Sequence, residues 1–285
     1  MNYRITGADD IAAVSAATIR AITDFQMRYP LRSKEINGPL WVYRRTNWDA
    51  RGQRRPVIML PGIQGGGDMF FATALALADV VSILTLSAPD ITVVDEMGHS
   101  LARFLQALDI NRTHVVGSSL GGYLAQSFAL LYPDMVDQLV IANGFIDPSP
   151  FVATQPPRAT FAATDAADLV NRNLQSLLTA PDKDEGEIRL KAAIKALVGP
   201  IQTLENYKSR LLLMMGGTAL LAPFISPERV MIVDDDHDPL LPPTMRNAVR
   251  QRFAKSELHT IEGGGHQPAI QRPKQFADLL RRRFS

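Results

Sequence analysis

The chain has 285 residues, of which 30 are Lys or Arg and 29 are Asp or Glu, and it contains no cysteine. The near balance of charge creates no long-range field that would favour a nucleic-acid partner, and the absence of cysteine excludes disulfides, thiol nucleophiles and thiolate metal sites. No apolar stretch reaches the roughly 20 residues that a membrane helix needs. Asp9 and Asp10 precede the first apolar run, where a signal peptide would carry basic residues. We therefore expect a cytoplasmic protein without a membrane span.

The first 30 residues are expected to form a helix. Asp9 or Asp10 is placed to cap it, the apolar pattern continues to about Met27, and Tyr29-Pro30 ends it. The sequence assigns no chemistry to this helix. Two roles are open, packing on the core of the protein or contact with a second copy in a homodimer.

A β-hairpin and a buried strand are predicted next. Residues 33–36 and 40–46 are two short strands joined by Asn37-Gly38, the strongest short signal for a hairpin turn. Residues 56–60, PVIML, form a buried strand that leads into the glycine-rich loop 61–67. This loop lacks the G-x-x-x-x-G-K-[ST] and G-x-G-x-x-G patterns, so a phosphate or dinucleotide site is not indicated.

Helices and strands alternate over the following eighty residues. We expect Asp68 to cap a helix that continues to Ala78. The later predicted elements are a strand at 81–86, a helix at 97–108, a strand at 113–116 and a strand at 138–142. Strands that alternate with helices of this length are typical of a mostly parallel sheet with helices on both faces.

The strand that begins at Thr113 leads into a possible nucleophile. Residues 117–121 fit G-x-S-x-G, in which the serine occupies a strained turn between a strand and a helix. The pattern alone is common by chance, but the β-branched run before it and the helical apolar pattern from Leu120 to Leu131 supply the context that it requires. Ser119 is therefore the candidate nucleophile. Ser118 does not fit, because its register would need glycine where Val116 stands.

Residues 148–226 interrupt the alternation with mostly helical patterns, such as 166–178 and 188–198. Inserted helices of this extent predict a cap over the strand ends, where open α/β sheets bind their ligands. Residues 211–215 and 220–225 are unusually apolar. They form either the core of the cap or an apolar pocket for an acyl group, which flexible methionines would suit.

A cluster of acidic residues follows the next predicted strand, at 229–233. It contains four aspartates and one histidine between Asp234 and Asp238. The cluster lacks the calcium-loop pattern and a second group of ligands, so the sequence does not favour a metal. A carboxylate that orients a catalytic histidine is the better interpretation, and Asp238 is the first choice, with Asp236 and Asp147 as alternatives.

The candidate base lies after the last predicted strand, at 256–262. Five histidines are present, and only His266 stands on a glycine-rich loop at the end of a strand, where a base would face the nucleophile. A final helix containing Phe276 ends near three arginines, which suit the negative end of the helix dipole.

These residues together resemble the α/β-hydrolase family from about Leu40 to Phe284. The order is serine, acid, histidine, and Gly265, His266, Pro268, Pro273 and Phe276 fit the histidine loop and closing helix of the family. Gln271, where relatives often have glutamate, and Pro61-Gly62, where His-Gly is common, depart from the pattern. The expected organisation is an N-terminal helix at 1–30, a core at 31–147 and 227–285, and the cap at 148–226.

The resemblance implies a serine hydrolase that acts through a covalent acyl-enzyme. His266 would accept the proton of Ser119, Asp238 would orient the imidazole, and the backbone NH groups of Ile63 and Leu120 would form the oxyanion hole. No metal or organic cofactor is implied. The expected substrate is a small or medium apolar ester or thioester, and hydrolysis of a carbon–carbon bond could use the same groups.

A noncatalytic role is the rival hypothesis. Residues 113–151 resemble the maspardin family, α/β-hydrolase relatives that are regarded as adaptors and lack a complete triad. Asp238 and His266 both stand in good triad context, and a site that had lost catalysis would have little reason to keep either. The sequence therefore favours catalysis over binding alone.

Overall fold

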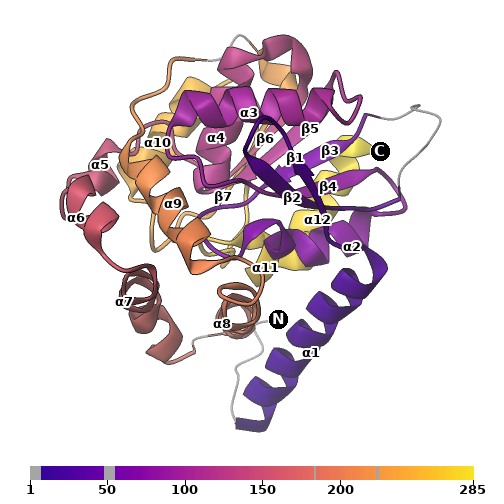
Figure 1. Cartoon of the computed structure of the whole chain (residues 1–285). Coiled ribbons are helices and arrows are strands. Elements are labelled where there is room, and N and C mark those ends of the chain that lie inside the picture. The colour runs from indigo at the N-terminus through magenta and orange to yellow at the C-terminus, as the bar shows by residue number, and fades with distance from the viewer. Residues whose placement is uncertain (1–7, 48–54, 183, 223–224) are drawn as a thin grey trace.

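The computed structural model describes residues 8–47, 55–182, 184–222 and 225–285 (Figure 1). Its centre is an eight-stranded sheet in the order β1-β2-β4-β3-β5-β6-β7-β8. The strands are β1 (Arg32–Glu35), β2 (Leu40–Arg45), β3 (Val57–Leu60), β4 (Ile83–Ser87), β5 (Thr113–Ser118), β6 (Val136–Ala142), β7 (Val230–Asp234) and β8 (Glu257–Thr260).

Helices cover both faces of this sheet, with α3 and α4 on one side and α2 and α12 on the other (Figure 1). The α-helices are α1 (Ala8–Arg28), α2 (Phe71–Leu77), α3 (Val94–Gln106), α4 (Leu120–Leu131), α5 (Ser149–Val152), α6 (Arg158–Ala163), α7 (Ala166–Thr179), α8 (Glu185–Leu197), α9 (Leu204–Met215), α10 (Pro243–Arg252), α11 (Pro268–Gln271) and α12 (Pro273–Phe284). The described ranges also contain three short 3-10 helices, η1 (Gly66–Phe70), η2 (Pro133–Met135) and η3 (Pro227–Arg229).

The predicted hairpin is confirmed. β1 pairs antiparallel with β2, and Asn37 and Gly38 between them have φ values of 51° and 103°. Two consecutive positive φ values are what a two-residue turn of matching twist requires. β2 is also antiparallel to β4, and all the remaining strand pairs are parallel. The expected mostly parallel α/β sheet is therefore correct.

The parallel strands direct their carboxyl ends to one edge of the sheet. β3 and β7 are buried along their whole length, because helices cover both faces of the sheet there. Loops that leave β3, β5, β6, β7 and β8 therefore emerge side by side, although they are far apart in sequence. Ile63, Ser119, Asp238 and His266 lie on these loops, and Leu120 begins the helix that follows β5.

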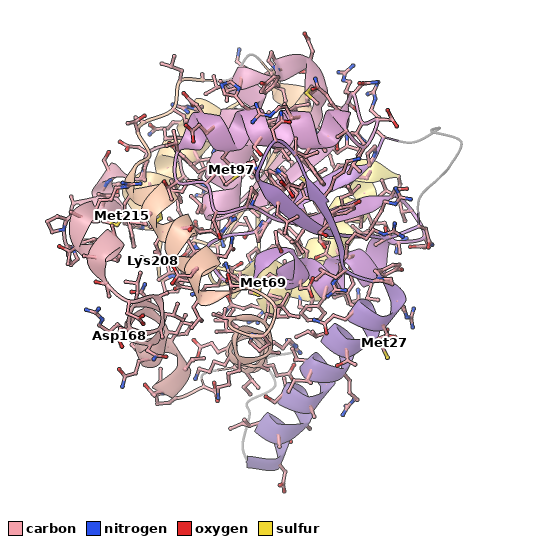
Figure 2. All side chains as sticks on the ribbon, viewed as in Figure 1. Met27, Met69, Met97, Asp168, Lys208 and Met215 are labelled. Atoms are coloured by element: carbon pink, nitrogen blue, oxygen red, sulfur yellow. The ribbon has the colours of Figure 1, made fainter. Side chains whose placement is uncertain are left out.

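The N-terminal helix α1 packs on α8 and α2. Ile22 and Phe25 of this helix are buried in the hydrophobic core, whereas Met27 is 71% exposed at the end of the helix (Figure 2). Part of the surface of α1 is thus used within the chain. No helix in the described ranges combines the length and the apolar character that crossing a lipid bilayer would require.

Asp68 does not cap a helix, contrary to the expectation from sequence. It lies inside η1, buried, and its carboxylate accepts hydrogen bonds from Arg44 Nε at 2.8 Å and Gln26 Nε2 at 2.9 Å. The buried guanidinium of Arg44 needs a counter-charge, and this need outweighs the weaker preference of a helix end for an acidic cap. Asp68 thereby joins α1, β2 and η1.

The inserted helical segment, residues 148–226, runs between β6 and β7 and contains α5 to α9. Leu211, Leu213, Met214 and Met215 of α9 are buried in the same hydrophobic cluster as the sheet, which favours a packing role for this apolar run. Lys208 on the same helix donates to Thr164 O at 2.7 Å and ties α9 to the end of α6 (Figure 2). The second apolar run, 220–225, lies partly outside the described residues.

Candidate active site

Ser119 occupies a sharp turn between β5 and α4. Its φ of 55° and ψ of −122° are values that a non-glycine residue rarely adopts. The turn is possible because two glycines flank it. A Cβ on Gly117 would lie 2.2 Å from Gly121 O, and one on Gly121 would lie 1.9 Å from Leu60 O. The G-x-S-x-G spacing is therefore a steric requirement of this strand, turn and helix.

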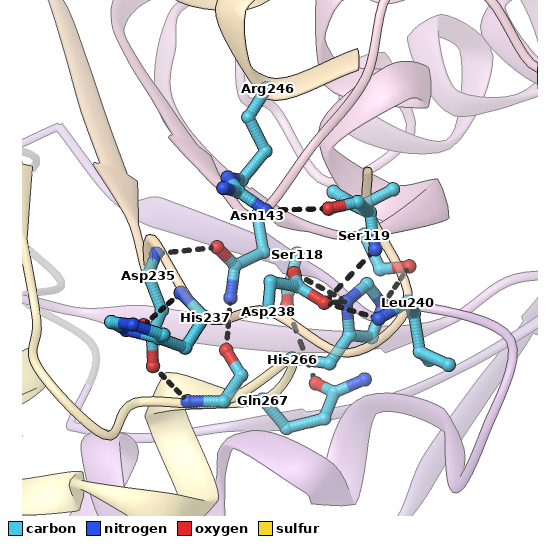
Figure 3. Close-up of polar contacts among 12 residues, drawn as sticks. Ser118, Ser119, Asn143, Asp235, His237, Asp238, Leu240, Arg246, His266 and Gln267 are labelled. Carbon is cyan, nitrogen blue, oxygen red and sulfur yellow. Dashed lines mark hydrogen bonds and ion pairs between the residues drawn. The ribbon is translucent and has the colours of Figure 1, made fainter. Parts of the chain in front are cut away.

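Three predicted side chains meet at the carboxyl edge of the sheet (Figure 3). His266 Nε2 lies 2.7 Å from Ser119 Oγ, and His266 Nδ1 lies 2.8 Å and 3.0 Å from the two carboxylate oxygens of Asp238. All three residues are buried, with 7% or 8% of their surface exposed. The arrangement can transfer a proton from the serine to the imidazole while the carboxylate holds the ring in place.

The two alternative acids bind elsewhere. Asp236 lies 2.7 Å from the Arg250 guanidinium and leaves 55% of its side chain exposed. Asp147 accepts the backbone NH of Ser149 at 2.8 Å. Among the three acids considered from sequence, Asp238 is thus the one that contacts His266. Within the described residues, the acidic and histidine side chains form no group of three or more that could hold a metal ion.

The surroundings of Asp238 keep its carboxylate ionised. Burial on its own would raise the pKa of Asp238. The hydrogen bond and charge of His266, together with the NH groups of Leu240 and Leu241, outweigh burial and hold the pKa below its usual value. Arg246 supports the same loop by donating to Leu241 O at 2.7 Å. An ionised acid is what a histidine needs in order to become an imidazolium.

The loop that carries His266 is bound on both sides of Gly265. Asn143 Nδ2 donates to Gly265 O at 2.6 Å, and Gly265 N donates to Asp235 Oδ2 at 2.6 Å (Figure 3). Asn143 follows β6 and Asp235 follows β7. Two neighbouring strands therefore set the position of the imidazole.

Gln267 and Gln271 hold the other side of this loop. The backbone NH of Gln267 donates to Gln271 Oε1 at 3.0 Å, and Ser118 Oγ lies 3.3 Å from Gln267 Oε1. An amide oxygen accepts the Gln267 NH much as a carboxylate would. This contact explains how glutamine can stand at 271, where the family often has glutamate.

The loop after β3 lies against the nucleophile. A Cβ on Gly62 would be 3.2 Å from Ser119 Cβ. Neither predicted oxyanion donor, the NH of Ile63 or of Leu120, is hydrogen-bonded to an acceptor among the described residues. Both NH groups therefore stay candidates for the oxyanion hole.

Side chains of the inserted helical segment hold this loop. Arg210 Nη2 donates to Pro61 O at 2.7 Å and Arg210 Nε donates to Gly62 O at 2.8 Å. Gln202 Nε2 donates to Ile63 O at 2.7 Å. The core and the inserted helical segment therefore meet at the site itself.

Four supporting residues were not found from the sequence: Asn143, Asp235, Gln202 and Arg210. Asn143 directly follows a predicted strand and Asp235 is the second residue after one, and polar residues in these positions are a usable signal. Gln202 and Arg210 stand in a helical region with no local pattern that separates them from other polar side chains.

Comparison with known proteins supports this description. The sequence profile described as the alpha/beta hydrolase family matches residues 57–279. A protein of Caulobacter segnis named "Putative carbamate hydrolase RutD" is 24% identical over 253 residues, covering 82% of this chain and 92% of the relative. Maspardin of Danio rerio is 36% identical over 104 residues, covering 35% of this chain and 33% of maspardin.

Among solved structures, the enol-lactonase from Burkholderia xenovorans LB400 superposes with a TM-score of 0.71 at 16% identity. The superposition covers 87% of this chain and 98% of that protein. At this identity the likeness concerns the fold alone. With most of its length matched by the family profile, the chain belongs to the alpha/beta hydrolase family.

Proposed function

We propose that this protein is a serine hydrolase that cleaves a carboxylic ester or thioester of a small or medium apolar substrate. The observation that supports this proposal is the continuous contact from Ser119 Oγ through the His266 imidazole to the Asp238 carboxylate. Contact of this kind, with the serine on a strained turn, serves nucleophilic catalysis in unrelated proteins.

The reaction proceeds in two halves. His266 Nε2 accepts the Ser119 proton while Oγ attacks the carbonyl carbon, and the NH groups of Ile63 and Leu120 bind the resulting oxyanion. The imidazolium then donates its proton to the leaving alcohol or thiol, and an acyl-enzyme remains. Water enters, His266 removes one of its protons, and collapse of the second tetrahedral intermediate releases the carboxylic acid and restores Ser119.

The inserted helical segment acts as a cap in this proposal. Ser119 and His266 expose only 8% and 7% of their surface, so we expect residues that cover the site to move apart when a substrate binds. α9 is the helix through which the segment contacts the loop beside Ser119. Displacement of this contact would open the site, and its return would exclude water during acyl transfer.

Three other functions are tested beside ester hydrolysis. The similarity to proteins named for carbamate hydrolysis adds carbamates, whose carbonyl carbon is open to the same attack. The partial similarity to maspardin keeps binding without catalysis as the competing hypothesis. Hydrolysis of a carbon–carbon bond could use the same three side chains, so substrates for that reaction are tested together with the esters.

A fluorophosphonate probe tests the proposal, because it reacts only with an activated serine. We expect covalent labelling of the wild-type protein, none of Ser119→Ala, and hydrolysis of p-nitrophenyl esters by the wild type alone. Equal labelling of both proteins would assign the reaction to a different residue. If the wild-type protein neither reacts with the probe nor turns over esters, thioesters or carbamates, the binding hypothesis replaces this one.

A further inference from the structure

Three consecutive backbone carbonyls of the loop after β3 accept hydrogen bonds from the inserted helical segment. Arg210 Nη2 donates to Pro61 O, Arg210 Nε donates to Gly62 O, and Gln202 Nε2 donates to Ile63 O. Gln202 also accepts the NH of Gly65 at 2.6 Å. Residues 137 to 149 positions away in sequence therefore determine the orientation of successive peptide groups at 61–65.

The burial of Arg210 is energetically unfavourable for a residue with a purely structural role. Only 2% of its surface is exposed. The hydrogen bonds of its guanidinium in the described residues go to the carbonyls of Pro61 and Gly62, and neither goes to a carboxylate. Burial lowers the pKa of Arg210 to about 10, although the negative charge of Asp90 opposes this, so the guanidinium keeps its charge at neutral pH. Burying a cation whose direct partners are carbonyl groups is unfavourable compared with an apolar side chain of similar size. The charge is thus better explained by its effect on the peptide groups that it binds.

The geometry of the peptide bond transmits that effect to Ile63. Gly62 C=O and Ile63 N–H belong to the same planar trans peptide, so they point in opposite directions. A donor fixed on Gly62 O therefore directs the Ile63 NH away from Arg210. The positively charged guanidinium that donates to this carbonyl oxygen also polarises the peptide group and strengthens its NH as a hydrogen-bond donor. Gly62 itself is next to Ser119, as the 3.2 Å approach of its Cβ position to Ser119 Cβ shows.

We propose that Arg210, assisted by Gln202, is a positioning residue that aims and polarises the Ile63 NH as an oxyanion donor. The inference rests on the proposed hydrolase function. In this proposal the oxyanion hole depends on the contact between α9 and the loop at 61–65. The Ile63 NH is correctly oriented only while the inserted helical segment contacts that loop. Arg210 acts through the peptide group and has no contact with the reacting atoms.

The test compares Arg210→Met with Arg229→Met, a matched control. Arg229 also donates from its guanidinium to two consecutive backbone carbonyls, Val136 O and Asp137 O, but these lie at the start of β6, at the opposite edge of the sheet. Both substitutions remove a charge and two carbonyl partners. Circular dichroism and thermal melting establish that each purified variant is folded.

The readout is the ratio of kcat/KM for a p-nitrophenyl ester to kcat/KM for the matching thionoester. Sulfur is a poor acceptor for NH groups placed to bind oxygen, so this ratio reports the aim of the oxyanion donors. Loss of a complete donor costs about 100- to 1,000-fold in kcat. For Arg210→Met, where the donor is misaligned but present, we expect a fall in ester kcat of roughly 10- to 100-fold with little change in KM. The oxygen-to-sulfur ratio should fall with it, and Arg229→Met should keep the wild-type ratio.

Two further variants cover the case in which Arg210→Met does not fold. Arg210→Lys keeps a cation that can bind one carbonyl, and Gln202→Met removes the contact with Ile63 O, so both should lower the ratio by a smaller factor. An unchanged ratio in the folded Arg210 and Gln202 variants, with an active wild type, would overturn this inference and leave the proposed function intact. A wild-type protein without turnover or probe labelling would overturn both.

Discussion

Asn143 and Asp235 bind each other and the same glycine. The NH of Asp235 donates to Asn143 Oδ1 at 3.1 Å, and the two side chains bind the carbonyl and the NH of Gly265. Gly265 directly precedes His266. Two polar residues at the ends of neighbouring strands therefore hold the backbone that presents the imidazole to Ser119.

Substitutions at Asn143 should separate this hydrogen bonding from backbone strain. Asn143 has a φ of 43°, which glycine adopts freely and alanine does not. Asn143→Gly removes two hydrogen bonds and should lower the free energy of unfolding by about 1 to 3 kcal/mol. Asn143→Ala should cost about 1 kcal/mol more. Urea unfolding of both variants measures the difference, and equal stability would exclude strain at this position.

The variants Asn143→Gly and Asn143→Ala also test whether the Asn143–Gly265 contact serves catalysis. If Gly265 must be held for His266 to stay within reach of Ser119, kcat for a p-nitrophenyl ester should fall to a similar extent in Asn143→Gly and Asn143→Ala. An unchanged kcat in a destabilised protein would show that this contact supports the fold only.

Exchange of the acid should separate Asp238 from its neighbour Asp236. Asp238→Asn removes the charge that stabilises the imidazolium, and we expect kcat to fall by about 1,000- to 10,000-fold. Asp236→Asn is the control, because that side chain binds Arg250 on the surface. Steady-state kinetics at pH 7 should leave Asp236→Asn within about threefold of the wild type, an effect smaller than 1 kcal/mol. A large loss of kcat in Asp236→Asn would show that Asp236 also takes part in catalysis.

The elbow glycine Gly121 should not tolerate a methyl group. In Gly121→Ala the added Cβ would lie 1.9 Å from Leu60 O. The backbone of β3 would have to shift to relieve this clash, which is energetically unfavourable. We expect a loss of more than about 3 kcal/mol in the free energy of unfolding, or no folded protein. Gly199→Ala is a useful comparison, because nothing lies within 4 Å of its Cβ position and only its φ of 93° is unfavourable. Thermal melting of the two variants should show the smaller loss for Gly199→Ala.

His114 gives stability a dependence on pH that is separate from catalysis. Burial is the main cause that lowers the pKa of His114 to about 4 from 6.5, and it outweighs the opposing charge of Asp137, whose carboxylate lies 3.4 Å from His114 Nδ1. Arg55, Arg112 and Arg283 lower it further. The ring is stacked on Phe284 of the last helix, with centroids 5.0 Å apart.

The direction of this dependence follows from proton binding. Between pH 6.5 and 4 the unfolded chain binds a proton at His114 that the folded protein does not, so stability falls as the pH decreases through this range. The loss attributable to His114 is on the order of 3 kcal/mol. Urea unfolding at pH 7 and pH 4.5 should show a smaller difference for His114→Gln than for the wild type. His237→Gln, at a side chain that is 88% exposed, should behave as the wild type does.

Local patterns in the sequence were sufficient for the order of the elements and for the three side chains that meet in the site. Apolar periodicity depends on nearest neighbours along a helix or strand, and Asn37-Gly38 and G-x-S-x-G depend on backbone conformations that few residues allow. Ser119, Asp238 and His266 each end a predicted strand or follow one closely. In a parallel sheet such positions converge, and for this reason three motifs that are distant along the chain predict a single site.

Only the tertiary structure decided which side chains support that site. Arg210 on α9 and Gln202, just before that helix, contact the loop at 61–65 from more than 130 residues away in sequence. No periodicity or turn signal encodes a contact of that separation. Asp68 shows that a local pattern can also mislead. Its position in the sequence predicts a helix cap, but in the folded chain it forms a buried ion pair with Arg44. A buried polar group is satisfied by whatever partner folding brings within reach, and that partner is a property of the packed chain.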